Sequence, residues 1–178
     1  MKTVIKKGEK LKIVKSTFFI YCSEDDVQLT KAIYTKAASL LDTEKGFFIS
    51  SHRSQGEQLS LVCAAHEGID MGKQLQGKLL KGDLERLNHS IIRYFGTLEP
   101  ATPSQIRREH TYEDISAYAA HVDYAFIEHV SVSSQNDIVF LKELQRISKE
   151  LSIRIEIGVN CNSQWREKIS AFASVMGV

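Results

Sequence analysis

The order of apolar patterns from residue 124 onward constrains the fold more than any other feature of the chain. It predicts a strand from Tyr124 to Val132, a long amphipathic helix, a second strand from Ser152 to Val159 and a closing helix. Ser134 and Asp137 predict a capping box at the start of the long helix. Strands that are joined through a helix usually lie parallel in one sheet, with helices on its faces. This segment therefore predicts a β-α-β-α unit in a parallel sheet.

The first half of the chain is predicted to contain antiparallel strands. Two short apolar runs, 47–52 and 58–65, flank the segment Arg53-Ser-Gln-Gly56-Glu, and this arrangement predicts an antiparallel hairpin. One or two further strands are expected within residues 3–22. The predicted fold class is thus α/β or mixed α+β, with a central, mostly parallel sheet of about six strands and helices on its faces.

Start and stop signals place the remaining helices. Ser23 with Asp26 predicts the start of a helix that ends near Gly46, and Asp83 predicts the start of another that Gly96 stops. The closing helix is expected to extend to Met176. Residues 1–178 are expected to form a single domain. Pro100 and Pro103 mark residues 97–104 as either a subdomain boundary or a long surface loop.

Composition excludes several classes of protein. The chain has 178 residues with a net charge of +1, which argues against a protein held to nucleic acid by bulk charge alone. No apolar run approaches the roughly 18–20 residues of a membrane span, and the amino terminus lacks the apolar region of a secretory signal. Cys22, Cys63 and Cys161 form no closely spaced pair, which is typical of a reducing compartment. We therefore expect a cytoplasmic protein.

Signatures of cofactors and metals are incomplete. Gly72 to Lys78 has the glycine spacing and the lysine of a phosphate loop, but Leu79 stands where Ser or Thr should bind magnesium. Cys63 and His66 have the spacing of a metal-ligand pair, but no second such pair accompanies them. We expect no cofactor and no metal, and the lack of a complete catalytic signature weighs against an enzyme.

Two His-x-Ser triplets offer an enzymatic alternative. His52 and Ser54 form the first triplet, and His129 and Ser131 form the second. They resemble the paired motifs of two-histidine phosphoesterases, and the resemblance implies histidines that act as acid and base and hydroxyls that steady the phosphoryl oxygens. Such chemistry requires both triplets to face one cleft. Otherwise His129 is an ordinary strand histidine with a satisfied hydrogen bond.

Basic residues suggest binding surfaces. The amino-terminal strands carry a group of lysines that either grip a partner or keep an edge strand from pairing with other chains: Lys6, Lys7, Lys10 and Lys12. Arg107 and Arg108 are adjacent residues that either anchor an interface or remain solvated.

The function that the sequence favours is binding of another macromolecule. Well-formed caps and apolar stripes without a catalytic signature are typical of a chain selected for a stable shape and a surface. We expect a protein partner, as for an inhibitor, an immunity-type antidote or an accessory factor, and no membrane. The alternatives are a phosphoesterase that acts on nucleotides or RNA, and a nucleic-acid accessory protein that uses the lysine-rich strands.

Overall fold

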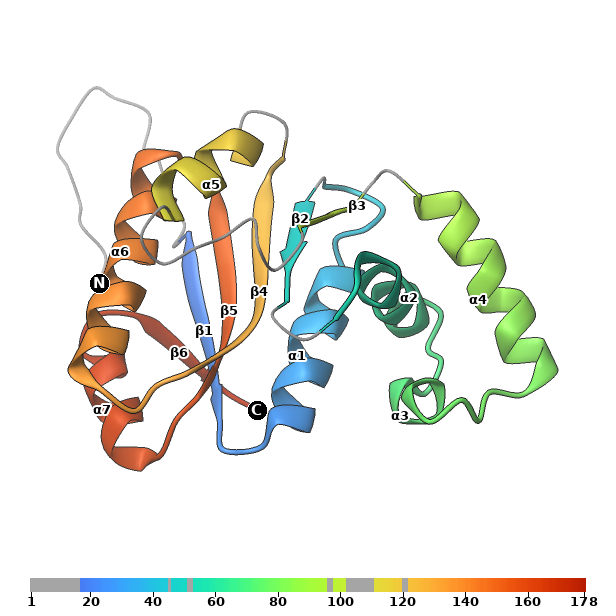
Figure 1. Cartoon of the computed structure of the whole chain (residues 1–178), viewed down its shortest axis with the longest axis horizontal. Helices are drawn as coiled ribbons and strands as arrows, with labels where there is room; N and C mark the ends of the chain where they lie inside the picture. Colours follow the sequence, from blue (N-terminus) through green and yellow to red (C-terminus); the bar gives the residue numbers. More distant parts are fainter. Residues whose placement is uncertain (1–16, 45, 51–52, 96–97, 102–110, 120–121) are drawn as a thin grey trace, which may run out of the picture.

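Strands and helices alternate along the described part of the chain, except that three helices lie between the second and third strands (Figure 1). The computed structural model describes residues 17–44, 46–50, 53–95, 98–101, 111–119 and 122–178. The elements are β1 (Phe18–Ser23), α1 (Asp26–Ala38), β2 (Gly46–Ile49), α2 (Gln55–His66), α3 (Met71–Leu75), α4 (Lys81–Tyr94), β3 (Leu98–Ala101), α5 (Thr111–Ala119), β4 (Tyr124–Ser131), α6 (Gln135–Glu150), β5 (Arg154–Asn160), α7 (Ser163–Ser170) and β6 (Ser174–Gly177).

The described strands form one six-stranded sheet with the order β3-β2-β4-β5-β1-β6. Every ladder between the described strands is parallel, and Ile20 of β1 lies opposite Ile157 of β5. The predicted α/β class, the count of six strands and the carboxyl-terminal β-α-β-α unit are confirmed. Because parallel neighbours need crossover connections, each strand from β1 to β5 is followed by helix before the chain returns to the sheet.

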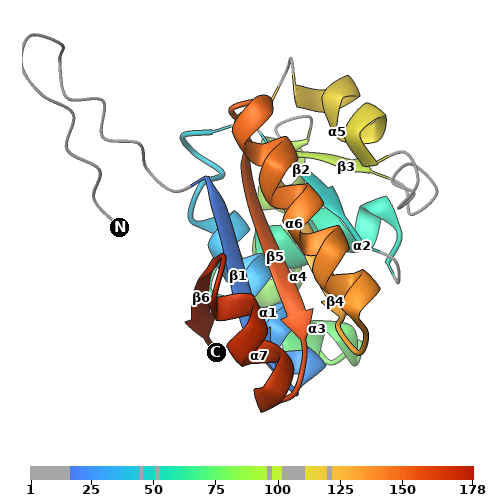
Figure 2. The same ribbon diagram turned by 90° about the vertical axis from the view of Figure 1, so that its left-hand side faces the viewer.

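Helices cover both faces of the sheet, as Figures 1 and 2 show. On one face, Ile20, Ile127 and Ile157 pack with apolar residues of α5, α6 and α7. On the other face, Phe48 and Phe126 pack with α1, α2 and α4. Side chains alternate between the faces along a strand, so the central strands contribute to two cores. Fully buried strands of this kind read as nearly continuous apolar runs.

The antiparallel hairpin predicted over residues 47–65 is wrong. Its first run forms β2, which pairs in parallel with β3 and β4, but its second run lies in helix α2. The physical reason is a capping box: the Ser54 hydroxyl accepts from the amide of Glu57, and the Glu57 carboxylate accepts from the amide of Ser54 at 2.8 Å. A helix then buries Leu59, Val62 and Cys63 on one face.

Helix starts and ends differ from the predictions by several residues in places. Asp25, rather than Ser23, caps α1, because Ser23 still belongs to β1. The same helix ends at Ala38, well before the predicted stop at Gly46. Asp83 lies in the first turn of α4 rather than at its cap, since α4 already begins at Lys81.

The carboxyl-terminal elements agree more closely. The capping box of Ser134 and Asp137 at the start of α6 is confirmed. The closing helix α7 ends at Ser170, and Met176 lies instead in the added strand β6. Within residues 97–104, Leu98–Ala101 form strand β3 at the edge of the sheet.

Candidate functional site

A cleft of about 710 Å³ opens between α1 and the segment formed by the end of α2 and α3. Val27, Thr30 and Lys31 contribute to the α1 wall, and Ile69 and Leu75 contribute to the opposite wall. Arg53, just after β2, and Glu128, near the end of β4, complete the lining. Ligands of parallel α/β sheets usually bind outside the carboxyl ends of the strands, where these residues lie.

Glu128 is a buried carboxylate at the base of this cleft, with only 1% of its surface exposed. Its Oε1 accepts a hydrogen bond from Nε of Arg53 at 2.8 Å and from the hydroxyl of Thr30 at 3.3 Å. Its Oε2 accepts from the hydroxyl of Tyr34 at 3.4 Å. A buried charge is tolerated only when it is paired and hydrogen-bonded, and Glu128 meets both conditions.

The backbone around Glu128 explains how a carboxylate reaches this place. In β4, Tyr124, Phe126 and Glu128 occupy alternate positions, which places Glu128 on the face that α1 covers. The ladder between β4 and β5 shifts register after Ile127, so the strand bulges at this point. In the facing strand β5, a side chain at Gly158 would overlap the backbone carbonyl oxygen of Glu128. Glycine at 158 therefore makes room for the bulge.

The surroundings of Arg53 favour the charged form of its guanidinium. Burial alone would lower the pKa of Arg53, but the hydrogen bond to Glu128 and the negative charge of Glu128 together raise it. Burial first, and then the charge of Glu128, raises the pKa of the Tyr34 hydroxyl. Neither Arg53 nor Tyr34 is thus set up to give up a proton near neutral pH. The arrangement suits recognition by a fixed guanidinium better than acid-base catalysis.

The rim of the cleft carries exposed apolar side chains beside the charged residues Asp26, Lys31 and Asp70. Val27, in the first turn of α1, is 74% exposed, and Leu75, at the end of α3, is 49% exposed. Both line the cleft, together with Met71 and Ile69. Exposed apolar residues that gather around a concave site mark a surface that binds something, whereas isolated ones are common. The cleft combines such a rim with a polar base.

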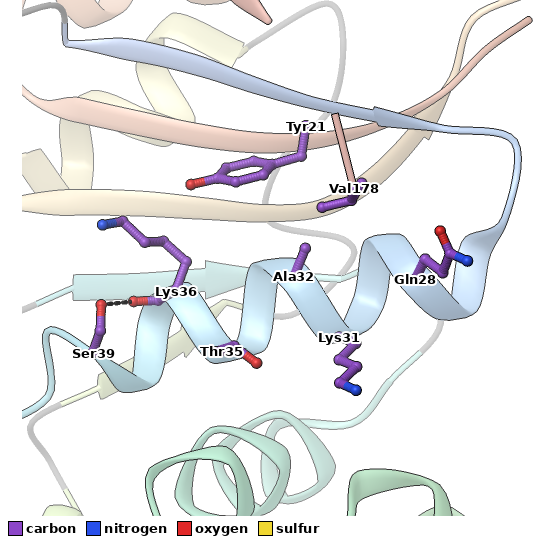
Figure 3. A pocket seen from close by; sticks show the side chains of 8 residues that line it. All are labelled: Tyr21, Gln28, Lys31, Ala32, Thr35, Lys36, Ser39 and Val178. Atoms are coloured by element: carbon purple, nitrogen blue, oxygen red, sulfur yellow. Dashed lines mark hydrogen bonds between the residues drawn. The ribbon is translucent and has the colours of Figure 1, made fainter. Parts of the chain in front are cut away.

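A second cavity, of about 530 Å³, lies on the other side of α1 (Figure 3). Tyr21 of β1, Ala32 of α1 and Val178 contribute to its lining. The hydroxyl of Tyr21 donates to Oε2 of Glu156 at 2.6 Å, and Glu156 also pairs with Arg154. The carboxylates of Glu128 and Glu156 thus both lie on the α1 face of the sheet, each with a cation and a tyrosine as partners.

The junction between β1 and α1 is acidic. Glu24, Asp25 and Asp26 are consecutive and exposed. Oδ1 of Asp25 accepts hydrogen bonds from the amides of Val27 at 2.8 Å and Gln28 at 3.2 Å. These amides are the donors with which a helix start binds an anionic ligand, so at α1 a carboxylate of the chain itself fills that role.

The structure describes two of the four side chains of the predicted phosphoesterase site, those of Ser54 and Ser131. Ser54 is the cap of α2, and its hydroxyl donates to the carboxylate of Glu57 at 2.7 Å. Ser131 is exposed at the end of β4. His129 lies in β4, but its side chain and the whole of His52 are outside the described residues. The second triplet lies in β4 and the first follows β2, which is the neighbour of β4 in the sheet.

The predicted binding residues lie outside the described part of the chain. This applies to Lys6, Lys7, Lys10, Lys12, Arg107 and Arg108. Their role in binding protein or nucleic acid therefore stays a prediction.

The predicted ligand-type motifs have structural roles where the structure describes them. Gly72 lies within α3, which does not follow a strand. Cys63 is buried in α2, and burial raises the pKa of its thiol, which disfavours the thiolate that a metal would need. His66 instead lies 3.2 Å from a carboxylate oxygen of Asp42 and 3.3 Å from the hydroxyl of Tyr94. Within the described residues, no three His, Cys, Asp or Glu side chains gather as a metal site would require.

Sequence reasoning misses the pair of Arg53 and Glu128. The two residues are 75 positions apart, and the sequence pattern places Arg53 in a hairpin loop. One signal is present: Glu128 interrupts the apolar run Tyr124-Ala-Phe-Ile, on the same face as Phe126. An acid at a buried strand position requires a partner, and this requirement points to a site.

Comparison with known proteins shows the fold but no family. No family model matches the chain, and no curated protein matches it. Among solved structures, the chain resembles an ATPase domain, with a TM-score of 0.64 and 11% sequence identity. The likeness covers 85% of this chain and 60% of that chain. At 11% identity, the resemblance establishes a shared fold.

None of the described helices is long and apolar enough to cross a membrane.

Proposed function

We propose that the protein binds a segment of another protein in the cleft between α1 and α3. The observation that carries the proposal is the exposure of Val27 and Leu75 on the rim of a cleft whose base holds the Arg53–Glu128 pair. Apolar side chains of a partner would bury the rim, and its polar backbone or side chains would meet the charged base. Protein interfaces commonly combine apolar anchors with a few fixed polar groups.

The start of α1 does not support ATP hydrolysis by this chain. The start of α1 follows a strand, which is where phosphate loops lie, but it carries Glu24, Asp25 and Asp26 in place of glycine and lysine. The carboxylate of Asp25 already satisfies the helix amides. Three negative charges at this point would repel a polyphosphate.

Substitution of the rim residues tests this proposal. We expect the double variant Val27→Asp and Leu75→Asp to lose a partner that the wild type retains from lysate of its native source, because two charges would have to be desolvated in the interface. Quantitative mass spectrometry of the captured proteins measures the loss. Val139→Asp is the matched control, since Val139 is an exposed valine on α6, away from the cleft.

The outcome that contradicts this proposal is equally clear. If the rim variant, folded as judged by circular dichroism, retains the same partners in the same amounts as wild type and Val139→Asp, the cleft is not the docking site. An inhibitor, an immunity-type antidote and an accessory factor are all compatible with this binding mode, and they differ in the partner they bind.

The three cysteines form no disulfide and are buried, which supports a cytoplasmic location.

A phosphoesterase is the second candidate, and the pairing of β2 with β4 is the observation that favours it. Ile49 and Ile127 are register partners, and the histidines at positions 52 and 129 follow them within three residues in sequence. We expect the variant His52→Ala with His129→Ala to lose hydrolysis of 2′,3′-cyclic nucleotides or RNA ends by at least about 100-fold if this candidate holds. Release of the hydrolysis product measures it, and wild-type protein without activity on these substrates eliminates the candidate.

A further inference from the structure

Helix α4 and the two residues that flank it, Leu80 and Phe95, carry an exposed apolar stripe that does not line the proposed cleft. Its buried face, with Leu87 and Tyr94, packs on the core that α1 and α2 share. A neighbouring flank points to solvent with four large apolar residues, of which Phe95 is 80% and Ile92 is 78% exposed. The stripe consists of Leu80, Leu84, Ile92 and Phe95. Figure 1 shows α4 at the end of the molecule farthest from α6 and α7.

The stripe is arranged about its own midpoint. Leu84 lies four residues before Asn88, and Ile92 lies four residues after it. Leu80 and Phe95 lie at nearly equal distances farther out. In two antiparallel copies of α4 related by a two-fold axis at Asn88, Leu84 of one copy meets Ile92 of the other, and Leu80 meets Phe95. A single polar residue at the centre of an apolar helix pair is a known means of fixing register.

Charges at the margin of the stripe are compatible with this pairing. Lys81 and Glu85 flank it, and they form an ion pair with each other at 3.9 Å within one copy. Both side chains are exposed, so at the margin of the contact they can stay solvated. The stem of Lys81 can also cover the ring of Phe95 from the other copy. An unrelated partner would have to supply a complementary register of its own, whereas a second copy supplies it by symmetry.

We propose that α4 is a self-association surface through which two copies of this chain form an antiparallel helix pair centred on Asn88. A helix of 14 residues is about 21 Å long. Such a contact buries less than the roughly 800 Å² per partner of a standard interface. The dimer is therefore expected to form reversibly, with a dissociation constant in the micromolar range.

A cysteine at the symmetry axis tests the geometry. Two helices packed about 8–10 Å apart bring facing Cα atoms at the axis within the roughly 4.4–6.8 Å that a disulfide spans. We expect Asn88→Cys to form a covalent dimer when oxidised glutathione is added at micromolar protein concentration. The native cysteines are buried and do not interfere. Val139→Cys, on an exposed position of α6, is the control and should stay monomeric.

Analytical ultracentrifugation of uncross-linked protein provides the second readout. We expect Ile92→Asp and Leu84→Asp each to raise the dissociation constant of the dimer at least tenfold, while Val27→Asp on the cleft rim leaves it unchanged. Wild type that is monomeric up to several hundred micromolar overturns the proposal. So does a dimer that both stripe variants leave intact, or equal cross-linking of Asn88→Cys and Val139→Cys. The cleft variants and the stripe variants change different residues. A failure of the dimer proposal therefore leaves the proposed binding cleft untouched, and the reverse also holds.

Discussion

Replacing Arg53 with alanine is expected to lower the free energy of unfolding by about 3 kcal/mol. The substitution leaves the carboxylate of Glu128 buried without its cation, and the hydroxyls of Thr30 and Tyr34 cannot supply the lost charge. Removing one partner of a buried pair costs more than the pair contributes in total, because the remaining charge is desolvated without compensation. Urea denaturation followed by circular dichroism measures the change.

Two further variants separate this effect from general loss of a side chain. Arg146→Ala removes an exposed arginine that pairs with Glu143 and Glu150 on α6, and it should cost less than about 1 kcal/mol. Adding Glu128→Gln to Arg53→Ala should restore part of the lost stability, because a neutral amide needs no cation. If Arg53→Ala and Arg146→Ala lower the free energy of unfolding by the same small amount, the buried pair of Arg53 and Glu128 does not contribute to stability as expected.

The second large effect is expected from Gly158→Ala. A Cβ atom at this position in β5 would overlap the carbonyl oxygen of Glu128 in the neighbouring strand and would also contact Ile33 of α1. Backbone cannot yield as a flexible side chain does, so the sheet must shift around the bulge of β4. We expect a loss of about 3 kcal/mol in the free energy of unfolding, measured by urea denaturation.

Gly56→Ala is the matched control for this prediction. Gly56 lies in helix α2, and a Cβ atom there would meet no other atom within 4 Å. Alanine at such a position should stabilise the protein by about 0.5–1 kcal/mol, because it restricts the unfolded chain. Equal and small effects of the two substitutions would mean that β4 and β5 do not approach each other as closely as the structure indicates.

The sequence predicts β4, α6 and β5 well, because their signals are local. Ser134 and Asp137 start α6, and the apolar stripe of that helix and the strands on both sides follow from periodicity alone. Residues 58–65 show the limit of this approach. A short apolar run suits a buried strand and a buried helix equally well, and only the capping box of Ser54 and Glu57 distinguishes them.

The sequence does not predict the cleft, and the reason is different. Arg53 and Glu128 meet because β2 and β4 are neighbours in the sheet, and neighbours in a parallel sheet are not read from local pattern. The rim residue Leu75 lies in a stretch where glycines obscure the periodicity, and α3 is only five residues long. The triplets of His52 and His129 are found by a sequence motif. Such a motif gives the spacing of residues along the chain but not their distance in space.

The strand order has a consequence for how the chain folds as it is synthesised. β1 begins at Phe18, yet both of its neighbours, β5 and β6, come from residues 154–177. During translation β1 therefore remains without either partner until residues 154–177 have left the ribosome. Contacts so distant in sequence slow folding, and an unpaired apolar strand is exposed to aggregation meanwhile. The earliest described strand to emerge is thus among the last to be completed.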